Sequence, residues 1–261
     1  MLNEIQKRIL QEVADMAAIP LDGAVNIRSD GQKAYRQNTK NIQIESKTDK
    51  DGIDIHIAPG TKAEHVYIPV VLTETGRHDM VYNDFFIGEG ADVQIVAGCG
   101  IHNCGDQESR HDGIHTFYVG KNSRVKYSEK HYGDGDGKGG KVMNPQTVVY
   151  LEEGAVIQMD TTQIRGIDST KRDTKIVCGP GAEAIITERL LTHGEQTAIS
   201  DMEIVLDGAD SKGRVISRSV AQDDSEQVFY PRMVGNAECF GHVQCDSIIM
   251  GNAKIKSIPA R

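Results

Sequence analysis

A glycine-containing turn followed by a short run of β-forming residues recurs along most of the chain, and this repeat limits the possible folds more than any other feature. The units begin at Ile57, Ile87, Val119, Leu151, Cys178, Leu206 and Val234. The turns return every roughly 27 to 33 residues, a period typical of solenoids. One strand and one turn cannot bury an apolar face alone, whereas stacked units share a continuous core. We therefore predict an all-β fold, a parallel β-helix, with a β-sandwich as the alternative that short strands and glycine turns also allow.

The first residues carry a helical pattern. Apolar residues recur there at spacings of three and four, at Leu2, Ile5, Ile9, Val13 and Met16. Because Pro20 ends the pattern, we predict one amphipathic helix over residues 3 to 18. This helix either caps the first turn of a sheet or docks a partner. We expect residues 1–45 to form the helix and a polar connector, and residues 46–261 to form the β-helix core.

The composition excludes several classes of function. The chain has 29 Lys and Arg residues against 38 Asp and Glu residues, a net charge of -9, so it lacks the basic footprint of a protein that binds nucleic acid or an anionic membrane. No apolar run approaches the roughly 18 residues of a membrane-spanning helix, and the start lacks the apolar region of a signal peptide. The five cysteines, an odd number in a chain of this length, are expected to stay reduced. A cytoplasmic location is the resulting expectation.

Cys245 lies in an apolar segment between two glycine turns, at Gly235 and Gly251. In a strand, alternation puts Cys245 on one face with Val243 and Ser247. A thiolate is the usual protein ligand of iron–sulfur clusters, and a rigid sheet would fix its direction. A single cysteine in a strand is also commonly a small packed hydrophobe, so the residues alone leave both interpretations open.

A second cysteine segment encloses a histidine, His102, between Cys99 and Cys104. If the segment is a turn, as Gly98 and Gly100 favour, both thiols and the imidazole come within reach of one metal ion. In an extended strand, Cys99 and Cys104 point to opposite faces instead. We predict the turn, and structural thiols are the alternative.

His111 and His115 lie four residues apart, which is the spacing of a helical metal-binding pair. Gly113 and the β-forming residues after it predict extended chain instead, in which residues four apart are separated by roughly 13 Å. Two imidazoles at that distance cannot share a metal ion. We expect a solvent-facing ladder of stacked histidines.

Glu129, Lys130 and His131 precede a glycine-rich acidic loop. On a strand these three residues alternate between the inner and outer faces, so the inward ones are candidates for chemistry in the interior, and a charged outer face is the alternative. The loop from Gly133 to Lys141 resembles a phosphate-binding loop, but Val142 stands where such a loop needs Ser or Thr. We predict a flexible surface loop that binds no nucleotide.

Several segments together resemble the SufB/SufD family, the β-helical scaffold proteins of the Suf iron–sulfur cluster assembly system. They are Gly98–Asn103, Ser109–Thr116, Tyr127–Gly133, Met143–Pro145 and the segment around Cys245. The resemblance covers nearly the whole chain and implies a right-handed β-helix. It further implies that Cys245 holds a transient [4Fe–4S] or [2Fe–2S] cluster and that Cys99 accepts sulfur as persulfide.

The remaining candidates for cluster or persulfide binding follow from the same resemblance. If the interior is a passage for sulfur, Glu129, Lys130 or His131 polarises a persulfide there. His102 and Cys104 complete the set, although Cys104 has no counterpart in the family. The metal ligand we predict first is Cys245.

The resemblance implies a scaffold and not an enzyme. Its expected partners are a SufC-like ABC ATPase, a second chain in a homodimer or a SufB/SufD-type heterodimer, and a cysteine desulfurase system as sulfur donor. A flavin reductant stays open, and the helical C-terminal region of the family is absent from this sequence. Two alternatives are a β-helical polysaccharide lyase or hydrolase, which the scarcity of aromatic residues (5%) and the absence of Trp disfavour, and a structural SufD-like subunit without cluster ligands.

Overall fold

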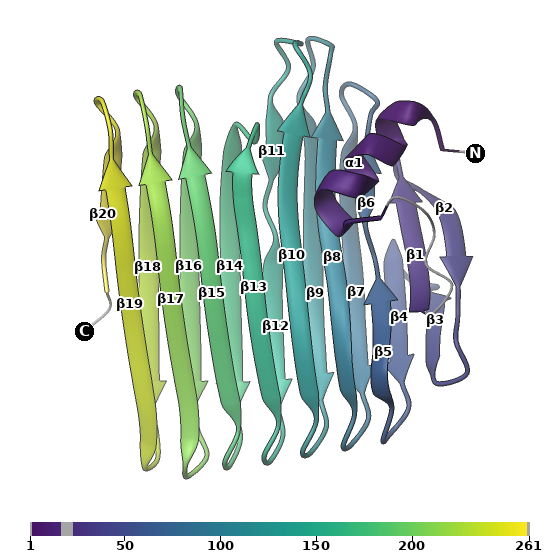
Figure 1. The fold of residues 1–261 in the computed structure, drawn as a ribbon, viewed down its shortest axis with the longest axis vertical. Helices are drawn as coiled ribbons and strands as arrows, with labels where there is room; N and C mark the ends of the chain where they lie inside the picture. Colours follow the sequence, from purple (N-terminus) through teal and green to yellow (C-terminus); the bar gives the residue numbers. More distant parts are fainter. Residues whose placement is uncertain (1, 17–22, 260–261) are drawn as a thin grey trace.

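The computed structural model of the chain describes residues 2–16 and 23–259. This part consists of one α-helix and twenty β-strands, and the strands lie side by side in two facing sheets (Figure 1). The predicted β-helix is confirmed: the chain is a β-solenoid whose coils each add a strand to both sheets. No helix in the described ranges is long and apolar enough to cross a membrane.

Each sheet has ten strands. Sheet A contains β1 (Gly23–Ser29), β2 (Gln32–Gln37), β5 (Lys62–Tyr67), β6 (Val70–Leu72), β8 (Asp92–His102), β10 (Arg124–Asp134), β13 (Val156–Arg165), β15 (Glu183–Thr192), β17 (Ser211–Ala221) and β19 (Cys239–Ile249). Sheet B contains β3 (Ile42–Ser46), β4 (Gly52–Ile57), β7 (His78–Ile87), β9 (Ser109–Val119), β11 (Lys141–Met143), β12 (Gln146–Leu151), β14 (Ser169–Cys178), β16 (Thr197–Leu206), β18 (Glu226–Gly235) and β20 (Lys254–Ser257).

The recurring glycine turn sets the register of the coils. From β5 onward, neighbouring strands in each sheet are parallel, and Arg124 of β10 pairs with Asp92 of β8 and with Val156 of β13. The turn before β8 needs a left-handed residue, which is Gly90 with φ +67°. Asn122 takes the equivalent position before β10 with φ +56°, a conformation that Asn tolerates better than most residues. Antiparallel pairs occur at the N-terminal end, between β1 and β2 and between β3 and β4.

The space between the sheets is filled by side chains that alternate inward along each strand. Along β7, for example, every second residue is buried. The rings of Phe85 and Phe117 stack inside with centroids 4.1 Å apart, and Tyr127 meets Phe117 edge to face. Because each coil alone exposes its apolar face, this continuous stacking stabilises the solenoid.

Helix α1 (Glu4–Ala14) begins with a capping box formed by Asn3 and Gln6. Its buried residues Ile9 and Val13 pack on the outer face of sheet A, over β8 and β10 (Figure 1). The predicted helix is therefore present, and residues 17 and 18 of the predicted range lie outside the described residues. It lies on the outer face of the N-terminal coils, where Ile9 and Val13 share a cluster with Val25 and Ile27 of β1 (Figure 1).

Candidate functional site

A row of polar side chains runs inside the solenoid along sheet A. One inward residue from each of five successive sheet A strands is in register with the next, in the order Glu129, Thr161, Glu188, Ser217 and Cys245. The first four are at most 5% exposed. Since strands in a sheet are about 4.8 Å apart, the row extends over roughly 19 Å of the interior and ends at a thiol.

Arg172, from β14 in the opposite sheet, lies between the two carboxylates of this row. Its guanidinium makes a short contact with Glu129 Oε2, and its Nε lies 3.9 Å from Glu188 Oε1. Glu188 also accepts hydrogen bonds from Ser200 Oγ at 2.8 Å and from Ser217 Oγ at 2.9 Å. The buried charges are therefore paired and hydrogen-bonded, as a low-dielectric interior requires.

The electrostatics of the row keep Glu129 ionised. Burial alone would raise the pKa of Glu129, but Arg172 and His131 outweigh it and hold that pKa well below its usual range. The same contacts raise the pKa of Arg172, although burial alone would lower it. Glu129 and Arg172 therefore form a permanent pair of opposite charges inside the solenoid.

Thr161, between Glu129 and Glu188, has an unused hydrogen-bonding group. Its hydroxyl oxygen is buried and has no hydrogen-bond partner in the structure. The side chain lines a cavity of about 10 Å³ together with Arg172, Glu188 and Ser200. This space is about the size of one water molecule, so a small polar species fits there.

The other end of the row reaches Cys99. His131 Nε2 lies 3.4 Å from Glu129 Oε1, and His131 is the register partner of Cys99 on the neighbouring strand β8. Cys99 is 7% exposed and points into the solenoid. Inward polar side chains thus take the register positions between Cys99 and Cys245.

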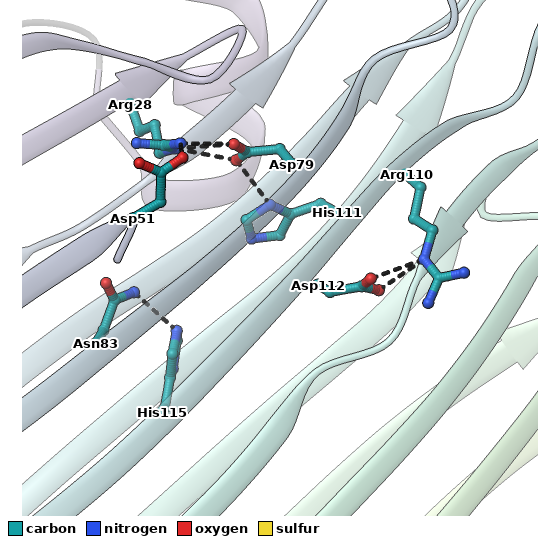
Figure 2. A network of polar contacts seen from close by, with 8 residues as sticks. All are labelled: Arg28, Asp51, Asp79, Asn83, Arg110, His111, Asp112 and His115. Atoms are coloured by element: carbon teal, nitrogen blue, oxygen red, sulfur yellow. Dashed lines mark hydrogen bonds and ion pairs between the residues drawn. The ribbon is translucent and has the colours of Figure 1, made fainter. Parts of the chain in front are cut away.

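Cys99 has a histidine and an aspartate beside it. Its thiol interacts with His111, whose Nδ1 lies 3.2 Å from Asp79 Oδ2, and Asp79 binds the Arg28 guanidinium at 2.7 Å. Figure 2 shows Asp79 between Arg28 and His111. Burial alone would lower the pKa of His111, but Cys99 and Asp79 outweigh it and raise that pKa to about 10.

The second histidine of this strand is held neutral. His115 contacts Asn83 Nδ2 at 3.2 Å (Figure 2). Its Nδ1 also lies 2.9 Å from Tyr127 Oη. Burial lowers the pKa of His115 to about 4, and the positive charge of His111 adds to the shift. The predicted solvent-facing histidine ladder is therefore wrong. Both rings are buried, because β9 turns them toward the interior.

Cys245 lies on β19, the outermost strand of sheet A, opposite Ser217 of β17. It is half-buried, and its Sγ lies 3.7 Å from Ser247 Oγ. Among the described residues, no group of three or more His, Cys, Asp or Glu side chains is arranged to hold a metal ion. Most residues of β19 are exposed, and Cys245 lies among them at the end of the polar row.

A comparison with known families identifies the family of the chain. The profile of the family described as "SUF system FeS cluster assembly, SufBD core domain" matches residues 72–260, which include both Cys99 and Cys245. The chain belongs to this family. Membership in the SufBD family assigns the chain a role in iron–sulfur cluster assembly.

Curated SufBD family proteins are similar to the chain over most of its length. An iron–sulfur cluster assembly SufBD family protein of Methanocaldococcus jannaschii is 25% identical over 228 residues, 85% of this chain and 71% of the relative. One of Archaeoglobus fulgidus is 23% identical over 213 residues, 81% of this chain and 56% of the relative. A chloroplastic one of Arabidopsis thaliana is 23% identical over 220 residues, 80% of this chain and 39% of the relative. The chain thus spans only part of these longer SufBD proteins.

The structure separates the residues of the predicted Cys99 segment. Strand β8 continues through His102, so the predicted turn is wrong, and Cys99 points inward while Cys104 is exposed. The glycines have another function: a Cβ on Gly98 would lie 2.2 Å from Val13 O of helix α1. Gly100 is equally close to the helix. In this SufBD core, glycine at both positions permits helix docking.

Alternation along β10 divides the three candidates after Tyr127. Glu129 and His131 are buried in the interior, at 2% and 4% exposure. Lys130 points outward, and its Nζ binds Asp15 Oδ2 at the end of helix α1 at 2.7 Å. Lys130 therefore cannot act in the interior. Cys178 is fully buried in the apolar core, where burial raises the pKa of its thiol to about 12.

Sequence reasoning missed most of the polar row. Glu188, Ser217, Thr161 and Arg172 were not recognised, because each is an ordinary residue within its own strand. The available signal was the repeat: Glu129, Thr161, Glu188, Ser217 and Cys245 take one position in successive coils. Aligning the repeats would have shown a polar residue recurring at a position that is otherwise suited to an apolar one.

Proposed function

We propose that the chain is a scaffold on which sulfur and iron are combined, with a nascent cluster carried as cargo on Cys245. The supporting observation is the buried row of polar side chains between Cys99 and Cys245. Burying two carboxylates and a guanidinium costs free energy, and apolar residues could fill the same space. Their presence in the interior therefore favours a functional role. Membership in the SufBD family supports the same role.

Donor groups in and beside the row suit anionic sulfur. Arg172, His131 and the Thr161 hydroxyl are donors that can bind a persulfide or hydrosulfide. In this proposal Cys99 accepts sulfur as persulfide, and the interior conducts sulfur toward Cys245. Thiolate is the ligand that a [2Fe–2S] or [4Fe–4S] cluster needs. None of these steps requires the chain to be a catalyst.

The proposed assembly includes partners that supply energy and further ligands. After the loop Gly133–Gly140 comes strand β11, whereas a nucleotide-binding loop is followed by a helix. We therefore expect a SufC-type ATPase to supply ATP hydrolysis in the cytoplasm and a cysteine desulfurase system to supply sulfur. A second SufB- or SufD-type chain beside β19 would bring ligands to Cys245 from the other side.

The test is anaerobic reconstitution of Cys245→Ser with ferrous iron and sulfide. Serine is nearly the same size as cysteine but binds iron–sulfur clusters poorly, so bound iron and acid-labile sulfide should fall at least about tenfold. Cys239→Ser is the matched control, because Cys239 is half-buried on the same strand. The parent chain, alone or with its ATPase partner, must first bind a cluster. Equal iron and sulfide in the parent and in Cys245→Ser would refute the proposal.

A further inference from the structure

The surface of the solenoid carries a cysteine, a histidine and an aspartate in a row. Cys104 Sγ lies 3.2 Å from His102 Nε2, and His102 Nδ1 lies 2.6 Å from Asp134 Oδ1. His102 and Asp134 end the neighbouring strands β8 and β10 and are register partners. Cys104 follows directly in the next loop and is exposed. We call this group the surface triad.

Asp134 is fixed on both sides. Its Oδ2 accepts hydrogen bonds from Tyr132 Oη at 3.1 Å and from Arg8 of helix α1 at 2.5 Å. Its Oδ1 remains for His102, so the His102 Nδ1–H donates to the carboxylate. The lone pair of Nε2 then faces the Cys104 thiol. This is the arrangement of an activated nucleophile: a base oriented by a third group and within reach of the proton it removes.

The loop that carries Cys104 is held in place. Asn103 is fully buried, and its side-chain amide donates to Gln107 O at 2.8 Å while its side-chain oxygen accepts from Gly105 N at 3.1 Å. The loop from Gly133 to Gly140 stacks on this segment, with Gly137 N donating to Asn103 O at 3.1 Å. A Cβ on Gly137 would lie 2.5 Å from the Cys104 backbone, so glycine is required there. The loop predicted to be flexible is thus a tightly packed support for the surface triad.

We propose that Cys104 is a nucleophile that takes sulfane sulfur from a persulfide donor at the surface. This inference rests on the proposed function, in which the chain must receive sulfur, and it names the accepting site. Cys99 is buried, so a macromolecular donor cannot reach its thiol, whereas Cys104 is exposed. Cys104 is a fitting first acceptor because its base is already in position.

The nearby amides favour attack on sulfur over attack on a carbonyl. Acyl transfer develops an oxyanion that needs free backbone donors. Here the amides of Gly105, Gly137 and Gly139 already donate to Asn103 Oδ1, Asn103 O and Gly105 O. Attack on a persulfide forms no oxyanion and needs only a thiolate and access to the sulfur.

The step balances without an oxidant or reductant. His102 Nε2 takes the proton of Cys104, and the thiolate attacks the outer sulfur of R–S–SH. The S–S bond of the donor breaks as the new S–S bond forms, which leaves Cys104–S–SH and R–S⁻. The proton on His102 then passes to the departing thiolate, so the products are a persulfide on Cys104 and the thiol R–SH.

The experiment follows sulfur on Cys104 by peptide mass spectrometry. The reduced chain is mixed with glutathione persulfide or, separately, with a cysteine desulfurase charged with L-cysteine. We expect the mass of one sulfur atom to be gained first on the Cys104 peptide. His102→Gln should slow this gain at least about tenfold, since a general base typically contributes a hundredfold or more. Transfer from only one of the two donors would support the proposal and identify the source as a small molecule or a protein.

Asp134→Asn tests the positioning of the base. Its rate should fall at a fixed pH, and its profile of rate against pH should differ from that of the parent, which a merely structural residue would not cause. Cys239→Ser is the control and should keep the parental rate on Cys104. An unchanged Cys104 rate in both His102→Gln and Asp134→Asn, or no gain on Cys104 from either donor, would overturn the proposal.

Sulfur uptake on Cys104 can be tested separately from cluster binding at Cys245. Cys104→Ser should still assemble a cluster from free iron and sulfide, because Cys245 is intact, but it should lose sulfur uptake from the persulfide donors. If Cys245 proves not to bind a cluster, sulfur gain on Cys104 can still be measured. The two proposals can therefore fail separately.

Discussion

Cys99 lies within β8 and Cys104 lies just after it, and each is close to a histidine that binds an aspartate. The two thiols nevertheless lie on opposite sides of the wall of the solenoid. Cys99 contacts His111, which in turn binds Asp79, in the interior, whereas Cys104 contacts His102 on the outer surface. We call Cys99, His111 and Asp79 the buried triad. The difference lies in the surroundings: Asp79 of the buried triad is ion-paired with Arg28 within the core, while Cys104 of the surface triad is exposed to solvent. The same functional groups are therefore buried and ion-paired inside, but accessible outside.

The largest expected contrast is in stability. Asp79→Asn leaves His111 and Arg28 buried without their carboxylate, so we expect a loss of about 3–5 kcal/mol in the free energy of unfolding. Asp134 is only 14% exposed, but its Arg8 partner is about half-exposed, so Asp134→Asn should cost less, about 1–2 kcal/mol. Urea denaturation of both variants measures the two losses. Equal losses would show that the two triads do not differ in their contribution to the fold.

Thiol accessibility gives the next contrast. In the native chain, Cys104 should react with a water-soluble thiol reagent roughly a hundredfold faster than Cys99, because reaction at Cys99 needs a local opening of about 3 kcal/mol. Cys99→Ser and Cys104→Ser assign the two rates. A fast reaction at Cys99 would mean that a donor can reach the interior directly, which removes the need for a surface acceptor.

Helix α1 packs on the outer face of β8, on the same side as the surface triad. A larger side chain beneath the helix should therefore affect the surface triad. Gly98→Ala places a Cβ 2.2 Å from Val13 O, and we expect a loss of about 1–3 kcal/mol as the helix shifts. Gly140→Ala is the control, since its Cβ would lie 3.8 Å from the nearest atom. Because Arg8 on the helix holds Asp134, Gly98→Ala should also slow the reaction of Cys104.

The buried triad also predicts a pH dependence. The pKa of His111 rises from 6.5 to about 10 on folding because of Cys99 and Asp79, so the folded chain keeps a proton that the unfolded chain loses above pH 6.5. The contribution is fully present below pH 6.5 and decreases as the pH rises toward 10, by about 1.4 kcal/mol per pH unit.

Unfolding of the parent and of His111→Gln between pH 6 and 9 measures this dependence. The neighbouring groups are Cys99, Asp79, Arg28 and the neutral His115, and only the parent should lose stability steeply over this range. An identical slope in the variant would assign the dependence to other groups.

The repeat in the sequence predicted the β-helix, and alternation showed that Glu129 and His131 share a face opposite to Lys130. The sequence pattern could not predict that β8 continues through Gly98 and Gly100. Glycine is needed at these positions because Val13 and Ile9, on a helix far away in the sequence, leave no room for a Cβ. The same holds for the partners of the candidate residues: Asp134 reaches His102, and Asp79 reaches His111, only because adjacent coils stack in register.

The docking of helix α1 has a consequence for the order of folding. Arg8 and Asp134 are 126 positions apart, so the helix is synthesised long before the strands that receive it. Closing so long a loop is slow, and N-terminal segments emerge from the ribosome first. The apolar stripe of α1 must therefore wait uncovered until β8 and β10 have been made, which exposes the nascent chain to chaperones. The surface triad becomes complete only after that step, so its geometry reports that the N-terminal coils have folded.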